Sequence, residues 1–196
     1  MAGGPSLELP PDTTALIVID LQKGIVERPA GPRDGATVVS SAARLADAMR
    51  ARGSFVVLVT VAFGPDLRDA LRPSSDDSTG TRTAPPPPDW SEIVSEMGPR
   101  SGDHLVTKKQ WGAFYGTDLD LQLRRRGIRT IVLCGIATCF GVESTARNAY
   151  ELAYEQVFVE DAMTSRNAEE HAHTVKNIFP RMGRVRTTDE VLAALR

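Results

Sequence analysis

The chain has 196 residues, of which 41% are hydrophobic and 24% are charged, and its formal net charge at pH 7 is −2. This length fits one domain with a substantial core, and the composition excludes an intrinsically disordered chain. The near-neutral charge excludes an overall electrostatic attraction to nucleic acid. The apolar runs are too short for a membrane-spanning helix. The first residues, MAGGPSLELPPDT, lack the basic start and apolar core of a signal peptide, so we expect a cytoplasmic protein.

The first predicted unit is a strand, a helix and a second strand. Thr14–Asp20 is an apolar run that ends in a carboxylate, as expected of a buried strand in a parallel sheet. Lys23–Gly35 is rich in glycine and proline and is predicted to be a loop. Apolar residues then recur at helical spacing over Val39–Met49, with Gly53 as the cap, and Phe55–Val61 is the second strand. Such a unit predicts parallel strands with a right-handed crossover.

One low-complexity segment follows, residues 73–89 with the sequence PSSDDSTGTRTAPPPPD. It cannot bury a core, and its prolines favour an extended polyproline geometry. We interpret it as a surface loop, and the alternative is a lid or a subunit-contact arm. Trp90–Met97 is predicted to be a short helix.

The second half of the chain continues the alternation of strands and helices. Strands are expected at His104–Thr107, Thr130–Cys134, Gln156–Glu160 and Met182–Arg186, and helices at 118–126, from 142 onward, at Asn167–Phe179 and at Thr188–Leu195. Gly135 is expected to end the central strand, and the helix after it presents one apolar face that includes Tyr150 and Ala153. About six strands with helices between them predict a three-layer α/β fold and a single domain over residues 1–196.

Polar groups stand at the ends of three predicted strands: Asp20, Lys108 and the Gly135–Gly141 turn. In a parallel sheet these ends meet along one edge, where open α/β sheets bind ligands. A carboxylate, an amine and a helix start with free N–H donors would form an acid–base site with an anion pocket. The alternative for Asp20 is that it only caps a turn.

Cysteines and histidines give little sign of a disulfide framework or a metal site. Cys134 and Cys139 are close together in the sequence, and Cys134 is expected to be a small buried apolar residue. His104, His171 and His173 are scattered, and the last two are expected to be exposed helix residues. We therefore expect neither a metal nor another cofactor.

Three segments resemble the blocks of the isochorismatase-like, or cysteine hydrolase, superfamily: VIDLQKG, TKKQWGAFYGTDL and GIATCFGVESTARNA. The resemblance runs in order from Asp20 to the last helix and leaves residues 73–89 unmatched. It implies a Rossmann-like, three-layer α/β/α sandwich with a six-stranded, mainly parallel sheet. It also implies a homo-oligomer, either a dimer or a tetramer, that acts on a small molecule.

By this resemblance Asp20 is the family's catalytic carboxylate and Lys108 its catalytic lysine, whereas Lys109 is one position off register. The family often has a cis peptide before the nucleophile turn, which here is the Ile136–Ala137 bond. The backbone N–H groups of Ala137 and Gly141 match its oxyanion donors.

The same blocks imply further substrate-binding positions. Trp111, Phe114, Ala137 and Thr138 would line the pocket, and Gln22 would orient Asp20 or a ligand. The alternative for the two aromatic side chains is packing in the core.

The chain departs from the amidase branch at the nucleophile. The cysteine of that branch follows the pattern G-x-x-T-x-x-C, in which Gly135 and Thr138 fit and Gly141 takes the place of the cysteine. Cys139 lies two residues earlier, and on a helix about 100° per residue would aim it elsewhere. Without a thiolate the usual acyl-enzyme route is closed. Isochorismatases resemble this chain here, because they also carry glycine and hydrolyse a vinyl ether without a nucleophile.

We therefore predict a hydrolase of isochorismatase type in which Asp20 is the general acid. Asp20 needs a raised pKa for this role, whereas a nearby Lys108 cation would lower it. A dicarboxylate substrate also needs cationic or N–H donors, and Arg82 and Arg100 cannot be placed from the sequence. Two alternatives stay open: a family member without catalysis that acts as a small-molecule binding or scaffold protein, and an amidase that uses Cys139.

Overall fold

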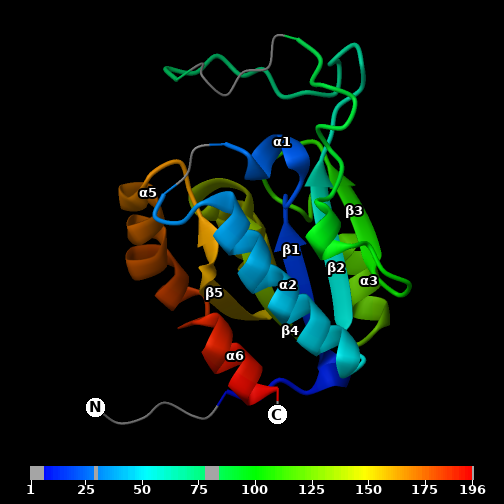
Figure 1. Ribbon diagram of the computed structural model, residues 1–196, viewed down its shortest axis with the longest axis vertical. Helices are drawn as coiled ribbons and strands as arrows, with labels where there is room; N and C mark the ends of the chain where they lie inside the picture. Colours follow the sequence, from blue (N-terminus) through cyan, green and yellow to red (C-terminus); the bar gives the residue numbers. More distant parts are fainter. Residues whose placement is uncertain (1–6, 29–30, 78–83, 196) are drawn as a thin grey trace.

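The computed structural model describes residues 7–28, 31–77 and 84–195 (Figure 1). Within these residues the centre is a six-stranded sheet in the order β3-β2-β1-β4-β5-β6, and every pairing is parallel. The strands are β1 Thr14–Ile19, β2 Phe55–Val61, β3 His104–Lys108, β4 Thr130–Ile136, β5 Glu155–Thr164 and β6 Arg184–Arg186. The strand order runs outward in both directions from β1 and β4, so the topology switches direction between these two strands.

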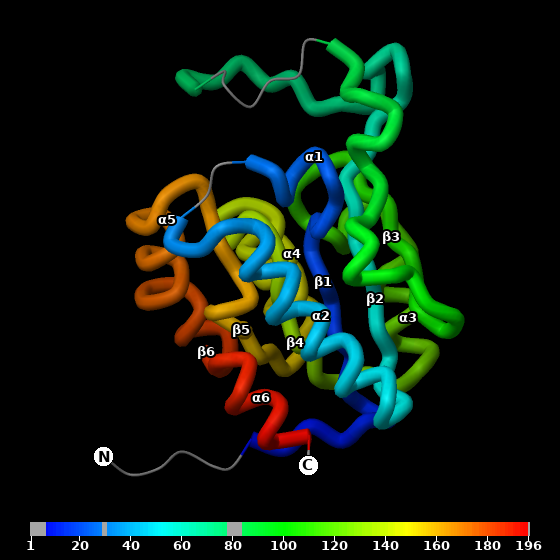
Figure 2. The backbone as a smooth tube through the Cα atoms, viewed as in Figure 1, coloured from blue at the N-terminus to red at the C-terminus, as the bar shows by residue number. Residues whose placement is uncertain are grey.

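Helices cover both faces of this sheet, which confirms the predicted three-layer fold (Figure 2). The α-helices are α1 Lys23–Val26, α2 Gly35–Ala51, α3 Leu119–Arg125, α4 Glu143–Glu151, α5 Ala168–His173 and α6 Thr188–Ala194. One apolar cluster packs α2 and α6 on one face, and a second cluster packs α3 and α4 on the other. β1 is buried along its whole length because it has neighbours on both sides and both faces.

Two helices begin at side-chain caps that the local sequence supplies. The Asp34 side chain accepts a hydrogen bond from the N–H of Thr37 and starts α2. Thr187 and Glu190 form a reciprocal capping box at α6. Gly53, with φ 77°, follows the end of α2, as the sequence predicts.

The structure corrects several predicted boundaries. Lys23–Val26 is a short helix and not a loop, because two N–H groups of its first turn bond back to the carbonyl oxygen of Gln22. Trp90–Met97 is mostly turn, and only Ser95–Met97 forms a 3₁₀ helix. Gly135 does not end β4: it lies inside the strand with φ 117°, where a Cβ atom would be 2.1 Å from the carbonyl oxygen of Ile19.

Two further corrections concern the elements after β4. β5 continues past the predicted end at Glu160 and reaches Thr164. Tyr150 is exposed on α4, and Ala153 lies beyond the end of that helix with φ 61°. The sequence predicts both residues on the apolar face, but Tyr150 faces solvent within α4 and the helix ends before Ala153.

The described part of residues 64–89 projects from the sheet edge where the strands end (Figures 1 and 2). Residues 73–77 and most of 84–89 are exposed, in agreement with the predicted surface loop. Asp69 pairs with Lys109 at 2.7 Å, and Asp77 pairs with Arg166 at 3.5 Å. Arg82 lies outside the described residues.

No helix in the described part of the chain is long and apolar enough to cross a membrane.

Candidate functional site

Asp20 and Lys108 meet at the carboxyl edge of the sheet, as their positions at strand ends predict. Asp20 directly follows β1 and has a φ of 53°, a left-handed conformation that is uncommon outside glycine. Lys108 is the last residue of β3. Its Nζ lies 2.7 Å from Oδ2 of Asp20, and both side chains are almost fully buried. The two strands therefore bring an acid and an amine together out of contact with bulk water.

Gly141 completes this group from the third strand end. It lies in the π-helical turn η3, Thr138–Val142, which follows β4 after the cis peptide bond Ile136–Ala137. A Cβ atom at Gly141 would be 3.2 Å from Oδ2 of Asp20 and 2.9 Å from Cγ2 of Ile19. The turn therefore touches the carboxyl group, and its closest residue has no side chain. The site lies at the topological switch point between β1 and β4, where open α/β sheets bind ligands.

Burial decides the protonation of Asp20. It raises the pKa of this carboxyl from 3.8 to about 6, although the Lys108 cation and its hydrogen bond act in the opposite direction. Lys108 donates to Oδ2 of Asp20 and to the carbonyl oxygen of Gln110. Oδ1 of Asp20 is buried and has no hydrogen-bond partner among the described residues. Oδ1 is thus the oxygen that is available to carry a proton.

Cys139 lies in the same turn, but its thiol contacts other groups. Its Sγ is 2.9 Å from Oγ of Ser165 and 3.4 Å from a carboxylate oxygen of Glu170, at the start of α5. Burial, together with the negative charge of Glu170, raises the pKa of this thiol to about 11. The thiol is therefore protonated at neutral pH and is a poor nucleophile. Cys134 is fully buried in the core, as expected.

His171 corrects the sequence-based expectation, because it is only 4% exposed, whereas His173 is exposed as expected. Nδ1 of His171 lies 2.9 Å from the hydroxyl of Thr138, which is itself buried in η3. Neither the histidine contact nor the contacts of Ser165 and Glu170 could be found from sequence spacing. They depend on how α5 packs against the turn.

Gln22 is buried, but its side chain is fully engaged with the backbone. Its Nε2 donates to the carbonyl oxygens of Val61 and Trp90, and its Oε1 accepts from the N–H of Val61. These bonds join the end of β2 to the segment that returns from residues 64–89. Gln22 thus holds two backbone segments together at the edge of the site. Its described hydrogen bonds do not include Asp20.

The two aromatic residues of the predicted pocket lie in different environments. Trp111 is 61% exposed and packs edge-on against Phe140, with a centroid distance of 5.0 Å. Phe114 is buried and stacks on Tyr154 at 5.8 Å, within the apolar cluster beneath α3 and α4. Trp111 is thus at the rim of the η3 turn, whereas Phe114 is positioned as a core residue.

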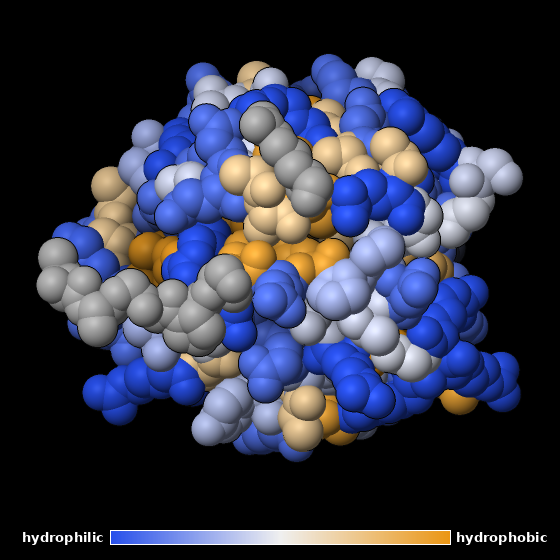
Figure 3. Space-filling model, turned by 90° about the horizontal axis from the view of Figure 1, so that it is seen from below, coloured by the Kyte–Doolittle hydropathy of each residue, from blue (hydrophilic) through white to orange (hydrophobic). Residues whose placement is uncertain are grey.

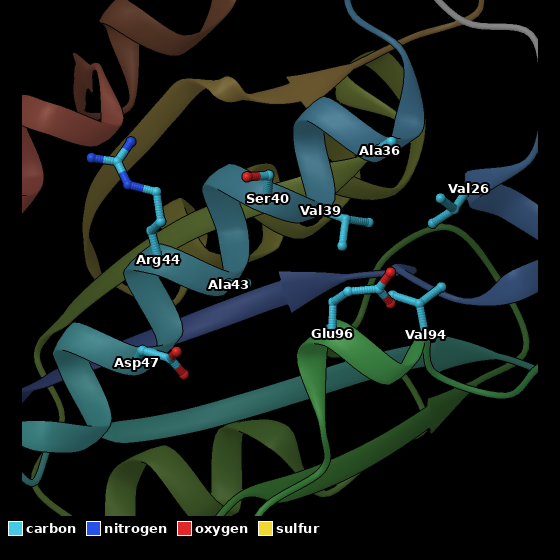
Figure 4. A pocket seen from close by; sticks show the side chains of 9 residues that line it. All are labelled: Val26, Ala36, Val39, Ser40, Ala43, Arg44, Asp47, Val94 and Glu96. Atoms are coloured by element: carbon cyan, nitrogen blue, oxygen red, sulfur yellow. The ribbon is translucent and has the colours of Figure 1, made fainter.

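Other charged and hollow regions lie apart from this group. Arg100 pairs with Asp47 of α2 at 2.8 Å. A groove of about 490 Å³ runs between α2 and residues 94–96, with Glu96 facing Val26 and Val39 (Figure 4). None of Asp20, Lys108 and Gly141 lines this groove. Among the described residues, no group of three His, Cys, Asp or Glu side chains is arranged to hold a metal ion.

Comparisons with known proteins agree with this architecture. The family model described as the isochorismatase domain matches residues 14–190. The isochorismatase family protein YwoC of Bacillus subtilis (strain 168) is 54% identical over 180 residues, which are 91% of this chain and 92% of that protein. The ureidoacrylate amidohydrolase RutB of Agrobacterium fabrum is 33% identical over 80% of this chain and 78% of its own. The structure of an isochorismatase family protein from Burkholderia thailandensis matches with a TM-score of 0.90 and 46% identity, over 97% of this chain and 98% of that one.

Proposed function

Because the chain belongs to the isochorismatase family of hydrolases, we propose that it hydrolyses a vinyl ether and that Asp20 is the general acid. The observation that carries this proposal is a buried carboxyl group with a pKa near 6, set against a turn whose nearest residue is glycine. A general acid works best when its pKa is close to the operating pH. An enolpyruvyl ether such as isochorismate is a substrate of this class.

The reaction begins with a proton transfer from Oδ1 of Asp20 to the terminal CH₂ carbon of the vinyl ether. The double-bond electrons form the new C–H bond, and a lone pair on the ether oxygen forms an oxocarbenium ion. Water adds to the cationic carbon and returns one proton to the Asp20 carboxylate. The resulting hemiketal then breaks its C–O bond to the alcohol, its hydroxyl proton passes to the leaving oxygen, and the products are pyruvate and that alcohol.

Lys108 has two roles in this scheme. Its hydrogen bond to Oδ2 at 2.7 Å holds the carboxyl group in one orientation and leaves Oδ1 to donate. Its positive charge stabilises the carboxylate that forms as the proton leaves. The backbone N–H groups of Ala137, just before the turn, and of Gly141, within it, would bind a carboxylate of the substrate.

The similarity to an amidohydrolase raises the alternative of amide hydrolysis through Cys139. This alternative requires a thiolate that reaches the substrate beside Asp20. The contacts of Sγ with Ser165 and Glu170, and the pKa near 11, oppose that role. No specific contact among the described residues favours the other alternative, a binding or scaffold protein without catalysis.

The direct test is incubation of the purified chain with isochorismate and a coupled assay for pyruvate. We expect pyruvate release that the variant Cys139→Ser retains, with no release of ammonia from ureidoacrylate. Absence of pyruvate from isochorismate and from other enolpyruvyl ethers would refute vinyl ether hydrolysis. Ureidoacrylate hydrolysis that Cys139→Ser abolishes would establish the amidase alternative instead.

A further inference from the structure

His171 and Thr138 form a buried link whose hydrogen-bond direction can be assigned. The hydroxyl of Thr138 lies 3.0 Å from the carbonyl oxygen of Thr164, which can only accept, so the hydroxyl donates its one proton there. At 2.9 Å the same hydroxyl must then accept from Nδ1 of His171. The ring proton is therefore on Nδ1, and burial keeps the ring neutral by lowering its pKa to about 4.

Within the described part of the chain, the other ring nitrogen, Nε2, has no hydrogen bond that would favour a proton there instead of on Nδ1. Nε2 of His171 is buried and has no hydrogen-bond partner among the described residues. Oε2 of Glu160 lies 3.9 Å from it, beyond hydrogen-bond distance. Glu160 is itself paired with Arg33 at 3.6 Å, and the charge of Arg33 also opposes protonation of the ring. The hydroxyl of Thr138 is thus the group that fixes the tautomer.

This link connects α5 to the turn that carries Gly141. Thr138 is the first residue of η3, and Gly141 is three residues later in the same turn. The turn also contacts α5 through Cys139 and Glu170, but that contact is only partly buried, whereas Thr138 is fully buried. The neutral ring of His171, held in α5, therefore fixes the position of Thr138 by donating a hydrogen bond to its hydroxyl.

We propose that His171 is a positioning residue, which acts through Thr138 to hold the η3 turn at the distance from Asp20 that the reaction needs. The inference rests on the proposed vinyl ether hydrolysis for its effect on rate. His171 touches neither Asp20 nor Lys108 in the described contacts. Its loss therefore displaces the donors and the open space at Gly141 while the acid and the amine stay paired.

The test compares His171→Leu, which has similar bulk and no donor, with His171→Asn, whose side-chain N–H takes approximately the place of Nδ1. The first measurement is the ¹⁵N–¹H signal of the Gly141 amide. We expect this signal to shift or broaden in the Leu variant and to return toward the wild-type position in the Asn variant. The second measurement is pyruvate release, for which kcat should fall about tenfold in the Leu variant with KM nearly unchanged, and recover in the Asn variant.

The two measurements separate the possible failures. If the wild-type chain releases no pyruvate, the proposed function fails, but the Gly141 signal still decides whether His171 positions the turn. An unchanged Gly141 signal in the Leu variant would overturn the inference. Equal losses of kcat in Leu and Asn variants of equal Tm would also overturn it, because a general packing role does not distinguish the donor.

Discussion

The two edges of the same sheet each bury an ion pair, but the pairs are satisfied differently. At the amino edge both carboxylate oxygens of Asp103 are bonded: Oδ1 by Arg50 at 3.0 Å, and Oδ2 by Arg50 at 2.7 Å and by the N–H of Arg100 at 2.9 Å. At the carboxyl edge Asp20 receives Lys108 on Oδ2, and its Oδ1 has no partner among the described residues. A fully bonded carboxylate holds structure together, whereas one with a free oxygen in a buried site has the capacity to move a proton.

Surface shape does not indicate which of the two edges carries the candidate chemistry. The amino edge has a hydrophobic band surrounded by hydrophilic side chains (Figure 3) and a groove of about 460 Å³ beside Arg50 and Asp103. Arg50 and Asp103, which line the hollow at that edge, are bonded to each other. The bonding state of a buried acid therefore locates the candidate chemistry better than the size of a cavity does.

The largest expected effect comes from removing the acid at the carboxyl edge. Asp20→Asn keeps the shape and an acceptor for Lys108 but has no proton to donate, so pyruvate release should fall about 10²- to 10⁴-fold. The assay is best performed at pH 5.5, where the wild-type carboxyl is mostly protonated and matches the neutral amide in charge.

The matched control at the amino edge is Asp103→Asn. It weakens the buried pair with Arg50 and should lower the free energy of unfolding by about 2–4 kcal/mol, with little change in kcat of the folded protein. Equal loss of activity in Asp20→Asn and Asp103→Asn would show that the two carboxyl groups do not differ in function.

The second effect comes from filling the space beside Asp20. Gly141→Ala places a Cβ atom 2.9 Å from the buried Cγ2 of Ile19 and 3.2 Å from Oδ2 of Asp20, so the turn must shift. We expect kcat/KM to fall about 10- to 100-fold, since small displacements of reacting groups carry penalties of this size. Gly53→Ala, at a position with φ 77° and open space around it, should cost about 1 kcal/mol of stability and no activity. Wild-type kcat/KM in Gly141→Ala would show that the turn does not bound the site.

The third effect is a pH dependence of stability. The pKa of Asp20 is raised from 3.8 to about 6, so the folded chain binds this proton more tightly than the unfolded chain. The stabilisation is complete below about pH 4 and is lost as the pH rises through 6, a change on the order of 3 kcal/mol. Urea unfolding of the wild type and of Asp20→Asn between pH 4 and 7.5 gives the difference in their free energies of unfolding at each pH. The opposite pH dependence that His171 contributes is the same in both proteins and cancels in this difference. A difference that is constant, or that grows with pH, would contradict the raised pKa.

The smallest effect is expected at the cysteine. Cys139→Ala removes contacts with Ser165 and Glu170 at the outer side of the turn. Pyruvate release should change by less than about threefold, and treatment with iodoacetamide should leave it intact. Inactivation by either change would show that the Cys139 thiol takes part in the reaction.

Much of this arrangement could be predicted from the sequence, because strand ends in a parallel sheet meet at one edge. That rule alone places Asp20, Lys108 and Gly141 together. It does not reveal whether burial or the Lys108 cation controls the pKa of Asp20, since the balance depends on packing. The sequence-based prediction that His171 is exposed is wrong for the same reason: local spacing on a short helix does not show that its ring faces Thr138. The roles toward a substrate stay predictions for Gln22, Trp111, Phe114, Ala137 and Thr138.

The pH dependence of kcat/KM for pyruvate release from isochorismate shows which protonation state of Asp20 is active. If Asp20 donates the proton, the rate is highest while the carboxyl is protonated and falls about tenfold per pH unit above a midpoint near pH 6. A rate that instead rises with pH through the same midpoint would mean that the ionised carboxylate is the active form, and would contradict the assignment of Asp20 as the general acid.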